Sequence, residues 1–480
     1  MRLYLSVFSI LICLLSCKKE KISDISPPDP SVITVPGSPD LHDFEINLIS
    51  RTTTSANIAW TNAGDYQSDS VIYTLSLNGQ QIAVNINATD YLITNLQPAT
   101  SYHVEIKASV SGNHFVVSSL DFITDDGYTK FQKSLYSNVA AYDIAIAPQN
   151  GYLICLYNAM RNGLLLSRVD SSGNELWRKT YTYNGMSTKI KMVGDGYVIM
   201  GGNYILKVDL DGNQVWYKSF EGQIGFVSFT EASNGDFLLA GSDNFISPEI
   251  YIQALVIRIT AKGDIVWRKS YGQTLRNTAM DIVPADNGGF YVLGSKEFNS
   301  EAIIQNSQYW LFKIDNAGNM DWEKTFGDDT YDFPIQLKKI NNYLIAGGYT
   351  SLDIGGDYQM QIFRLDLNGN VLKQSPVKEP GFYDFLLAVE STNDGGYIVS
   401  GTISQGTSGY VLGLFKYDAS DNLLWSKSFQ YNDDFTYWSK SMAIKQTADN
   451  GFILPAAKWQ LYGEHTNLWL LKLNPTGSYE

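Results

Sequence analysis

Residues 128–480 repeat one two-part unit seven times, and this repetition constrains the fold more than any other feature of the sequence. The first part is an apolar run after a turn, as in Gly-Tyr-Val-Ile-Met-Gly at 196–201 and Gly-Tyr-Ile-Val-Ser-Gly at 396–401. The second part is a hairpin of the form Lys-x-Asp-x-x-Gly-Asn-x-x-Trp-x-Lys. Successive turn residues lie 39 to 56 residues apart, at Gly173, Gly212, Gly263, Gly318, Gly369, Asp421 and Gly477.

Each copy has room for four short strands, and a four-stranded repeat of about 50 residues is typical of a β-propeller blade. We therefore expect an all-β chain in which residues 128–480 form a seven-bladed β-propeller with four-stranded blades. The last copy stops before its fourth strand, whereas residues 131–135 match the fourth-strand pattern and precede the first copy. A strand at 129–136 is predicted to complete the last blade, which closes the ring and leaves no unpaired edge.

Tryptophan marks the predicted fourth strand in five copies: Trp177, Trp216, Trp267, Trp322 and Trp425. The fifth hairpin departs from the pattern with Lys373. Because the tryptophans keep a constant place in the repeat, we interpret them as core residues that pack between adjacent blades, rather than as a platform for a ligand.

The hairpin resembles two known propeller signatures and departs from both. The sialidase-type Asp box has Asp two residues before Gly and an aromatic residue three after it, whereas the intervals here are three and four. The tryptophan-docking motif of quinoproteins and outer-membrane assembly lipoproteins shares the interval of four, but it has Thr-Gly in the turn and belongs to propellers that usually have eight blades. As a whole, residues 128–480 most resemble uncharacterised bacterial extracellular propellers with repeated Asp-Gly-Gly-Tyr-Ile-Val-x-Gly units.

Residues 41–125 alternate apolar and polar side chains in short runs separated by turn signals, which is typical of a β-sandwich. This region resembles a fibronectin type III domain. Trp60 fits the core tryptophan of its second strand, and Tyr73 fits the tyrosine of its third. Leu-Gln-Pro-Ala-Thr-Ser-Tyr at 96–102 fits the corner in which the tyrosine hydroxyl bonds back to the preceding loop. The resemblance implies a spacer or interaction module.

The N-terminus carries an apolar stretch at 3–15 that is too short to span a bilayer, which favours a signal peptide at 1–16. It ends in Leu-Leu-Ser before Cys17 and resembles the signal of bacterial lipoproteins; an ordinary secretory signal with a chance cysteine is the alternative. The resemblance implies cleavage before Cys17, acylation of this residue with palmitate-type chains, and the membrane as a partner. Residues 17–40 hold five of the chain's 14 prolines and predict an extended tether after the lipidated cysteine. By the same resemblance, Lys18 favours sorting of the protein to the outer membrane of the bacterial cell envelope. Whether the protein lies on the periplasmic side or on the cell surface stays open.

Charge and composition exclude some functions. The net charge is −14 and there is no basic run, so nucleic acid is excluded as a partner. Three of the four histidines lie in or near the sandwich, so no metal site is expected in the propeller, and no cofactor is predicted. No specific catalytic motif is present, although a carboxylate pair for glycoside cleavage stays open because its members need only meet in space. Cys155 lies in an apolar run and is expected to be buried.

In a propeller, the loops between second and third strands lie on the same face as the loops between blades. We call it the variable face, because these second-to-third-strand loops are long and diverse here, as at 243–253, 296–308, 350–358 and 458–467. In the last blade, the loops 430–440 and 458–467 are predicted to bring together Tyr431, Asp433, Asp434, Phe435, Tyr437, Trp438, Trp459, Tyr462 and His465. Aromatic side chains stack on the C–H faces of sugars, and carboxylates accept hydrogen bonds from sugar hydroxyl groups. This combination of residues therefore predicts a glycan site. Packing of these rings on each other or on the sandwich is the alternative.

We therefore favour a non-enzymatic, lipid-anchored protein of the cell envelope that binds a glycan or a protein through the variable face. A propeller glycoside hydrolase or lyase is one alternative, and a scaffold for envelope proteins is another. A carboxylate pair in the central funnel would favour the enzyme, and a large apolar patch without a pocket would favour the scaffold.

Replacement of Cys17 by Ser is expected to abolish fatty-acid labelling and to release the protein from membranes, because the variant has no sulfur to acylate. Metabolic labelling and membrane fractionation measure both effects. Cys13→Ser, which changes a cysteine inside the apolar stretch, is the control and is expected to be labelled normally. Undiminished labelling of Cys17→Ser contradicts the lipoprotein assignment.

Overall fold

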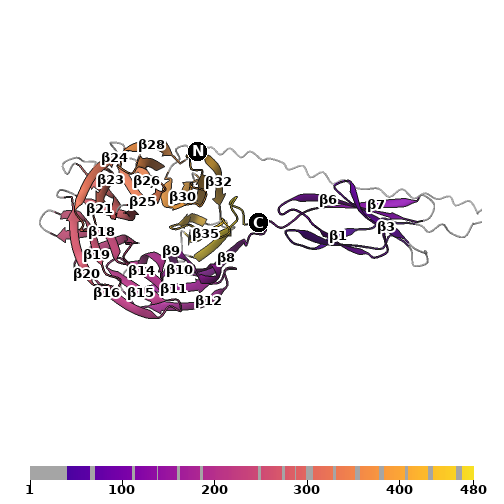
Figure 1. The fold of residues 1–480 in the computed structure, drawn as a ribbon, viewed down its shortest axis with the longest axis horizontal. Coiled ribbons are helices and arrows are strands. Elements are labelled where there is room, and N and C mark those ends of the chain that lie inside the picture. Colours follow the sequence, from indigo (N-terminus) through magenta and orange to yellow (C-terminus); the bar gives the residue numbers. More distant parts are fainter. Residues whose placement is uncertain are drawn as a thin grey trace, which may run out of the picture. The chain divides into compact units, whose positions relative to one another are not determined.

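The structure is a computed structural model that describes residues 41–479 apart from short segments. These segments are 65–70, 111–113, 138, 159–162, 184–186, 247–249, 273–275, 287, 299–305, 328–330, 352–356, 378–382, 406–408, 431–435 and 461–466. The expected signal peptide, the expected lipidation site Cys17 and the expected tether therefore lie outside the described residues. The chain divides into two compact units, Met1–Gly127 and Tyr128–Glu480 (Figure 1). In the described part, the regular structure is all strand except for one short 3-10 turn, Pro148–Asn150.

The first unit has two antiparallel sheets. One contains β1 (Ile46–Arg51), β2 (Ser55–Trp60) and β5 (Asp90–Thr94), in the order β1-β2-β5. The other contains β3 (Ile72–Leu77), β4 (Gln80–Ile86), β6 (Ser101–Ser109) and β7 (Phe115–Ile123), in the order β4-β3-β6-β7. Buried and more exposed side chains alternate along β2 and β6. One face of each strand therefore contributes to a shared apolar core.

Two tyrosines of this core have their hydroxyl groups paired. The rings of Trp60 and Tyr73 meet edge to face at 5.3 Å, and the Tyr73 hydroxyl donates to Asn62 Oδ1 at 2.9 Å. The backbone N–H of Gln97 donates to the hydroxyl oxygen of Tyr102 at 2.8 Å. The corner implied by the fibronectin type III resemblance is therefore formed.

The second unit is a β-propeller. Five sheets each have four antiparallel strands in chain order. The strands are β9 (Val139–Ala147), β10 (Gly151–Asn158), β11 (Gly163–Val169) and β12 (Glu175–Tyr181); β13 (Ser187–Val193), β14 (Gly196–Gly201), β15 (Tyr204–Asp209) and β16 (Gln214–Ser219); β17 (Ile224–Glu231), β18 (Phe237–Ile246), β19 (Ile250–Ile259) and β20 (Ile265–Tyr271); β21 (Asn277–Ala285), β22 (Gly289–Glu297), β23 (Ser307–Ile314) and β24 (Met320–Phe326); and β25 (Asp332–Ile340), β26 (Tyr343–Ser351), β27 (Tyr358–Asp366) and β28 (Val371–Pro376).

A further sheet of nine strands contains two more groups. The first is β29 (Phe385–Ser391), β30 (Tyr397–Ser404), β31 (Tyr410–Tyr417) and β32 (Leu423–Phe429). The second is β33 (Thr436–Ser441), β34 (Lys445–Gln446), β35 (Phe452–Gln460), β36 (Asn467–Leu473) and β8 (Phe131–Ser137). The two groups are joined by a single parallel bridge between Tyr410 and Trp438.

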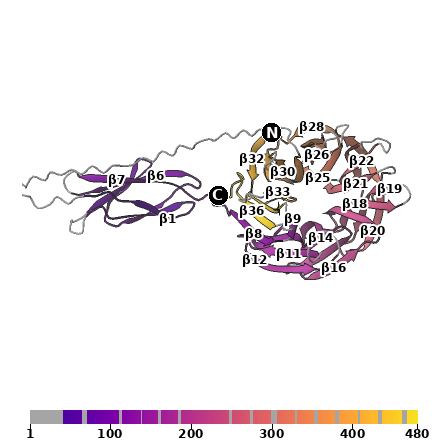
Figure 2. The same ribbon diagram turned by 180° about the vertical axis from the view of Figure 1, so that it is seen from behind.

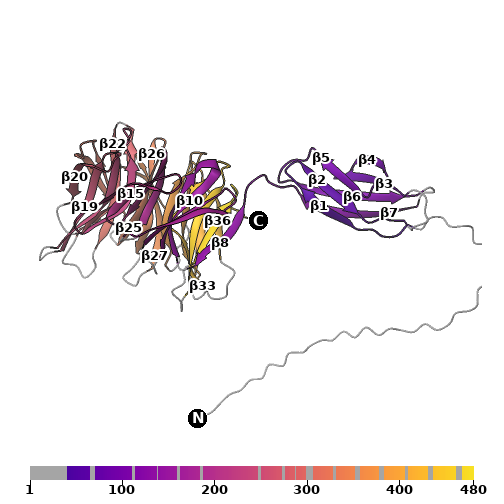
Figure 3. The same cartoon turned by 90° about the horizontal axis from the view of Figure 1, so that it is seen from below.

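The first strand of each group lies toward the centre and the fourth forms the rim (Figure 1), as the view from behind also shows (Figure 2). Seen from the side, the sheets stand next to one another around the ring (Figure 3). The middle strands β11 and β14 are buried along their whole length, because a neighbouring sheet covers each of their faces. The apolar clusters therefore lie between sheets; one of them joins Leu153 of β10 to Ile199 of β14.

The two ends of the propeller are paired with each other. Strand β8 runs antiparallel to β36, with Phe131 opposite Lys472 and Tyr136 opposite Leu468. The first strand of the unit is thus the outermost strand of its last group. This pairing covers an edge that would otherwise expose unpaired backbone groups.

The tryptophans of the fourth strands lie over the turn glycines of the next sheet. A methyl group on Gly212 would sit 2.6 Å from the Trp177 ring, and one on Gly369 would sit 2.7 Å from Trp322. Both glycines have positive φ angles of 77–79°, which residues with a side chain rarely adopt. The tryptophan ring in addition occupies the space that a side chain would need. The same contact recurs at Trp216–Gly263, Trp267–Gly318 and Trp425–Gly477, and Phe131 of β8 takes the tryptophan place over Gly173.

The rest of the hairpin motif holds the turn in shape. Asp170 accepts backbone N–H groups from Ser172 and Asn174 at 2.9 and 2.8 Å, and it also accepts the Asn174 side-chain amide. The hydrogen bonds from Asn174 and Ser172 keep the pKa of Asp170 below its usual value. Lys133 of β8 then reaches across to Asn174 Oδ1 at 2.6 Å. The motif therefore stabilises its own turn and also binds the neighbouring sheet.

One junction uses a different contact. Lys373 replaces the tryptophan on β28, and Asp421 replaces the glycine in the following turn with a positive φ of 63°. Arg364, which pairs with Lys373 in register, donates to Asp421 Oδ1 at 3.1 Å and to the Ala419 carbonyl at 2.8 Å. Its guanidinium also lies 3.6 Å from the Tyr343 ring centroid. Both departures from the repeat therefore occur at the same junction.

Two expectations need correction. The tryptophans of the fourth strands are half-buried, because a fourth strand lies at the rim and has less protein around it; Trp310 and Trp469, on third strands, are fully buried. Much of the loop expected at 243–253 is a continued hairpin in which Asp243 to Ile246 pair with Gln253 to Ile250. In addition, the innermost strand of the last group is interrupted, since β33 ends at Ser441 and β34 begins at Lys445.

Replacement of Gly212 by Ala is expected to cost about 2–4 kcal/mol of stability, because the methyl group meets the Trp177 ring as well as forcing an unfavourable backbone angle. The control is Gly235→Ala, with a φ of 84° and nothing within 4 Å of the added methyl group, and about 1 kcal/mol is expected there. Chemical denaturation compares the two. Equal losses contradict a stabilising role for the contact between sheets.

Candidate functional site

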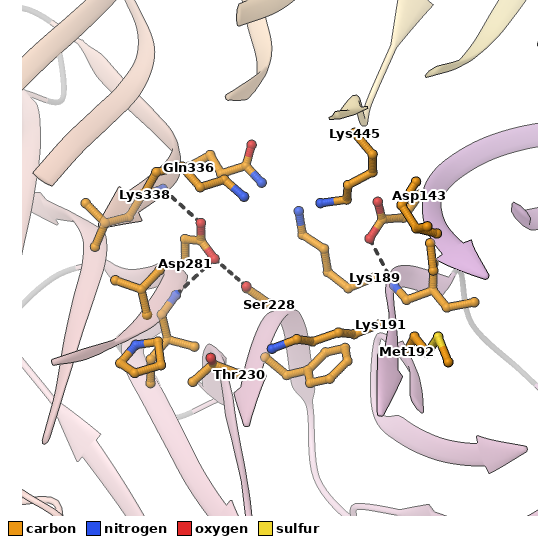
Figure 4. Close-up of a pocket in the computed structure, with 18 residues that line it drawn as sticks. Asp143, Lys189, Lys191, Met192, Ser228, Thr230, Asp281, Gln336, Lys338 and Lys445 are labelled. Atoms are coloured by element: carbon orange, nitrogen blue, oxygen red, sulfur yellow. Dashed lines mark hydrogen bonds between the residues drawn. The ribbon is translucent and has the colours of Figure 1, made fainter. Parts of the chain in front are cut away.

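The innermost strands of the propeller line a central cavity of about 420 Å³ (Figure 4). Strands β9, β13, β17, β21 and β25 contribute to it, together with Lys445 of β34. The polar and charged lining residues are Asp143, Lys189, Lys191, Ser228, Thr230, Asp281, Gln336, Lys338 and Lys445.

The two aspartates of the cavity hold neighbouring sheets together. Asp143 Oδ2 accepts the backbone N–H of Ile190 at 3.0 Å, and Asp281 Oδ2 accepts that of Leu337 at 2.8 Å. Gln336 repeats this contact with the backbone N–H of Val389 at 2.6 Å. These three acceptors follow irregularities in their strands and connect one innermost strand to the next. Their first role is therefore structural.

A second set of residues lies two positions further along the innermost strands, and three of its charged members form a cluster. Glu390 of β29 accepts Lys338 at 2.9 Å and Lys445 at 3.1 Å through one carboxylate oxygen. Burial raises the pKa of Glu390, but the charges and hydrogen bonds of the two lysines outweigh it and lower the pKa to about 2. Burial lowers the pKa of Lys445, but Glu390 and then Asp143 outweigh it and raise the pKa above the usual value. Glu390 and Lys445 are therefore ionised at neutral pH.

A second cavity, of about 260 Å³, opens where innermost strands begin and second strands end, which is the variable face. It lies between the sheets β21–β24 and β25–β28, and we call it the variable-face cavity. Glu297 is 6% exposed; its Oε2 accepts the backbone N–H of Arg276 at 3.1 Å, and its Oε1 is buried without a hydrogen bond from the described residues. Asp332 and the aromatic residues Tyr331 and Phe333 also line this cavity.

Aromatic rings continue from this cavity along the variable face. The ring of Phe333 stacks on that of Tyr349 at 4.8 Å, and Tyr349 meets Phe385 edge to face at 5.1 Å. We call the six connected rings the aromatic band: Tyr331, Phe333, Tyr349, Tyr358, Tyr383 and Phe385. None of the six is fully buried, and Tyr383 is 38% exposed. The band therefore offers apolar ring faces at the surface.

The site expected from the sequence lies largely outside the described residues. Tyr431, Asp433, Asp434, Phe435, Tyr462 and His465 fall in undescribed segments, and only the backbone is described for Tyr437, Trp438 and Trp459. That backbone corrects one expectation: Trp438 belongs to β33 and Trp459 to β35, so neither lies in a loop. The two are direct partners in the register of these strands.

Sequence reasoning missed the aromatic band, although a local signal for it exists. Tyr-Asp-Phe occurs at 331–333 and again at 383–385, each time where an innermost strand begins. Comparing the starts of the innermost strands between copies would have found it. Cys155 is fully buried, as expected.

Two features are absent from the described residues. No group of three or more His, Cys, Asp or Glu side chains is placed to hold a metal ion. In the same part of the chain, no helix has the length and apolar character required to cross a bilayer.

Comparisons with known proteins agree with the architecture. Residues 41–119 match the fibronectin type III domain. A comparison with curated proteins found no match. The all-β expectation is therefore confirmed, with a fibronectin type III domain followed by the four-stranded sheets of a β-propeller.

Several solved structures are similar at low identity. One is the WD40 domain of Pan2 from Neurospora crassa, with 12% identity, 71% of this chain and 95% of that chain covered, and a TM-score of 0.45. Another is the β-propeller domain of the Trilobed protease from Pyrococcus furiosus, with 10% identity, coverages of 73% and 98%, and a TM-score of 0.42. A third is a quinonprotein alcohol dehydrogenase-like protein from Bacteroides thetaiotaomicron, with 12% identity, coverages of 81% and 97%, and a TM-score of 0.40. Likenesses at this level say nothing about function.

Acid is expected to weaken the propeller through Glu390. Its pKa falls from the ordinary 4.5 to about 2 on folding, so its stabilising contribution is complete above pH 4.5 and is lost as the pH falls through 2. We expect a loss of about 2–3 kcal/mol over this range, measured by denaturation. Glu390→Gln is expected to be less stable at pH 7 and less sensitive to acid, whereas Glu221→Gln, which changes an exposed residue, should follow the parent protein. Identical pH profiles for Glu390→Gln and the parent contradict this role.

Proposed function

We propose that the chain is a non-enzymatic, lipid-anchored binding protein of the bacterial cell envelope, whose seven-bladed propeller recognises a glycan on its variable face. The aromatic band beside the variable-face cavity carries this proposal. The blade count takes β29–β32 as one blade and β33–β36 with β8 as the next.

The chemistry of the variable face suits a sugar. Half-exposed rings such as Tyr331 and Tyr383 offer flat apolar surfaces for the C–H faces of a pyranose. The adjoining cavity supplies a carboxylate from Glu297, a guanidinium from Arg276 and hydroxyls from serine and threonine. Such groups accept from and donate to sugar hydroxyls, which fix the orientation of a ligand in a small pocket.

The strand that carries Tyr437 and Trp438 lies near the aromatic band. Tyr383, a member of the aromatic band, lies close enough to Tyr410 to influence its ionisation. Tyr410 in turn bridges to Trp438 through the backbone. The band is therefore near the strand that carries Tyr437 and Trp438, which supports one continuous binding face that includes the expected site.

The acids of the central cavity favour binding over catalysis. A glycoside hydrolase needs a carboxylic acid with a raised pKa close to a second carboxylate. Instead, the pKa of Glu390 is lowered by Lys338 and Lys445 in spite of its burial, and Asp143 and Asp281 accept backbone N–H groups. The observation that favours a hydrolase as second candidate is that Glu297 and Asp332 line one cavity on the variable face.

The location rests on the sequence alone. The apolar stretch that ends before Cys17 supports lipidation, and the proline-rich segment up to residue 40 supports a tether between the anchor and the folded units. Lys18 supports the outer membrane. A scaffold for other envelope proteins stays an alternative function.

Tyr331→Ala and Tyr383→Ala are each expected to weaken glycan binding by about 1–3 kcal/mol, because each removes a ring face from the site. Trp438→Ala and Trp459→Ala are expected to act in the same direction. A glycan-array screen of the full chain, followed by titration of the variants, measures these losses. Tyr128→Ala, which changes a tyrosine that is 37% exposed and outside the band, is the matched control.

The outcomes separate the candidates. Absence of any glycan ligand, or full affinity in all four variants, contradicts the proposal. Unfolding of the Trp438 or Trp459 variant would show that these rings are packing residues. Cleavage of a bound glycan, lost in Glu297→Gln, would establish the hydrolase instead.

A further inference from the structure

The central cavity holds an excess of positive charge in a protein that is acidic overall. Its lining contains four lysines, Lys189, Lys191, Lys338 and Lys445. Asp143 and Asp281 are the acids of this lining, so its residues carry two more positive than negative charges. Glu390 and Glu231 act on these lysines from outside the lining. The whole chain has a net charge of −14, so this excess is local.

The acids of the cavity are already engaged. Both carboxylate oxygens of Asp143 and of Asp281 accept backbone N–H groups, which keeps these side chains against the walls. Glu390 is shared by Lys338 and Lys445. Lys189 and Lys191 form no ion pair with the residues that the structure describes, and their ammonium groups point into the cavity (Figure 4).

The lysines also oppose one another. Lys191 is open to the cavity, yet the surrounding protein lowers its pKa first through desolvation, and Lys338 and Lys445 lower it further against the attraction of Glu231. A negatively charged ligand among these ammonium groups would relieve this repulsion. Each ammonium group carries three donors, and the hydroxyl of Thr230 lines the same space, whereas the hydroxyl of Ser228 already donates to Asp281.

We propose that the central cavity is a second binding site, separate from the variable face, and that Lys189 and Lys191 there bind a small molecule through an oxyanion group. The group is a phosphate, sulfate or carboxylate, since these accept several charge-assisted hydrogen bonds at once. A cavity of about 420 Å³ lined by strands on several sides accommodates a metabolite or a single acidic sugar rather than a macromolecule.

The test uses the full chain purified in detergent at low ionic strength and pH 7. Calorimetric titration with inorganic phosphate, sulfate, glucuronate and uncharged glucose identifies the group that binds. At least one of the three anions is expected to bind, whereas glucose is expected not to bind. Lys189→Gln and Lys191→Gln are each expected to weaken binding of that anion about tenfold or more, whereas Lys191→Arg retains most of it.

The matched control is Lys339→Gln, which makes the same change in net charge next to Lys338. Lys339 pairs with Asp286 at 2.6 Å and does not line the cavity, so its replacement should leave the affinity unchanged. If all three Gln variants weaken anion binding equally, the effect comes from the overall charge of the protein and the proposal is overturned. Failure of every anion to bind at millimolar concentration would also overturn it.

A second measurement needs no variant that could fail to fold. The pKa of Lys191, followed by NMR of the parent protein, is expected to rise when the bound anion is added, and an unchanged pKa overturns the site. Tyr331→Ala and Tyr383→Ala should keep full anion affinity. Failure of glycan binding and failure of anion binding are therefore distinguishable.

Discussion

An aromatic side chain that packs on a glycine connects one sheet of the propeller to the next. The closed circle of sheets depends on this contact. A fourth strand at the rim has little apolar surface of its own, so a large ring that covers the neighbouring turn adds buried area where the core is thinnest. Glycine is required beneath the ring because the turn has a positive φ and the ring occupies the space of a side chain. The contact between Phe131 and Gly173 shows that the strand closing the circle uses the same chemistry.

The centre of the propeller is organised differently from the rim. At one position of the innermost strands, Asp143, Asp281 and Gln336 satisfy backbone groups of the adjacent strand and so hold the strands in register. Two residues further on, side chains are not needed for this purpose, and the charged cluster of Lys338, Glu390 and Lys445 occurs there. Contacts between strands and the charged cluster therefore occupy alternate positions of the innermost strands. Lys189 is the exception, because it takes the first position of its own strand and lines the cavity.

Features that recur within one copy of the repeat were predictable from the sequence. The turn glycines and the strand tryptophans are of this kind, as is the resemblance of residues 131–135 to a fourth strand. Features assembled from one residue of each copy were not predictable, because Lys191, Lys338 and Lys445 are far apart in the chain and only the closed ring brings them together. The degree of burial was also misjudged for the tryptophans, since a repeat pattern indicates which residues pack but not how much protein surrounds them. Trp438 and Trp459 were assigned to loops because their copy departs from the pattern, whereas the strands simply continue to include them.

The exceptional junction between Lys373 and Asp421 has a consequence for how such repeats diverge. A tryptophan cannot pack over a turn whose central residue has a side chain. A glycine turn that is not covered by an aromatic side chain leaves apolar surface exposed. The two positions are therefore constrained as a pair, although they belong to different copies. Arg364 bridges to the new aspartate and restores an attraction across the junction. The two positions at a junction between copies are therefore constrained together more tightly than the positions within one copy. Related chains should show correlated substitutions between the fourth strand of one copy and the turn of the next.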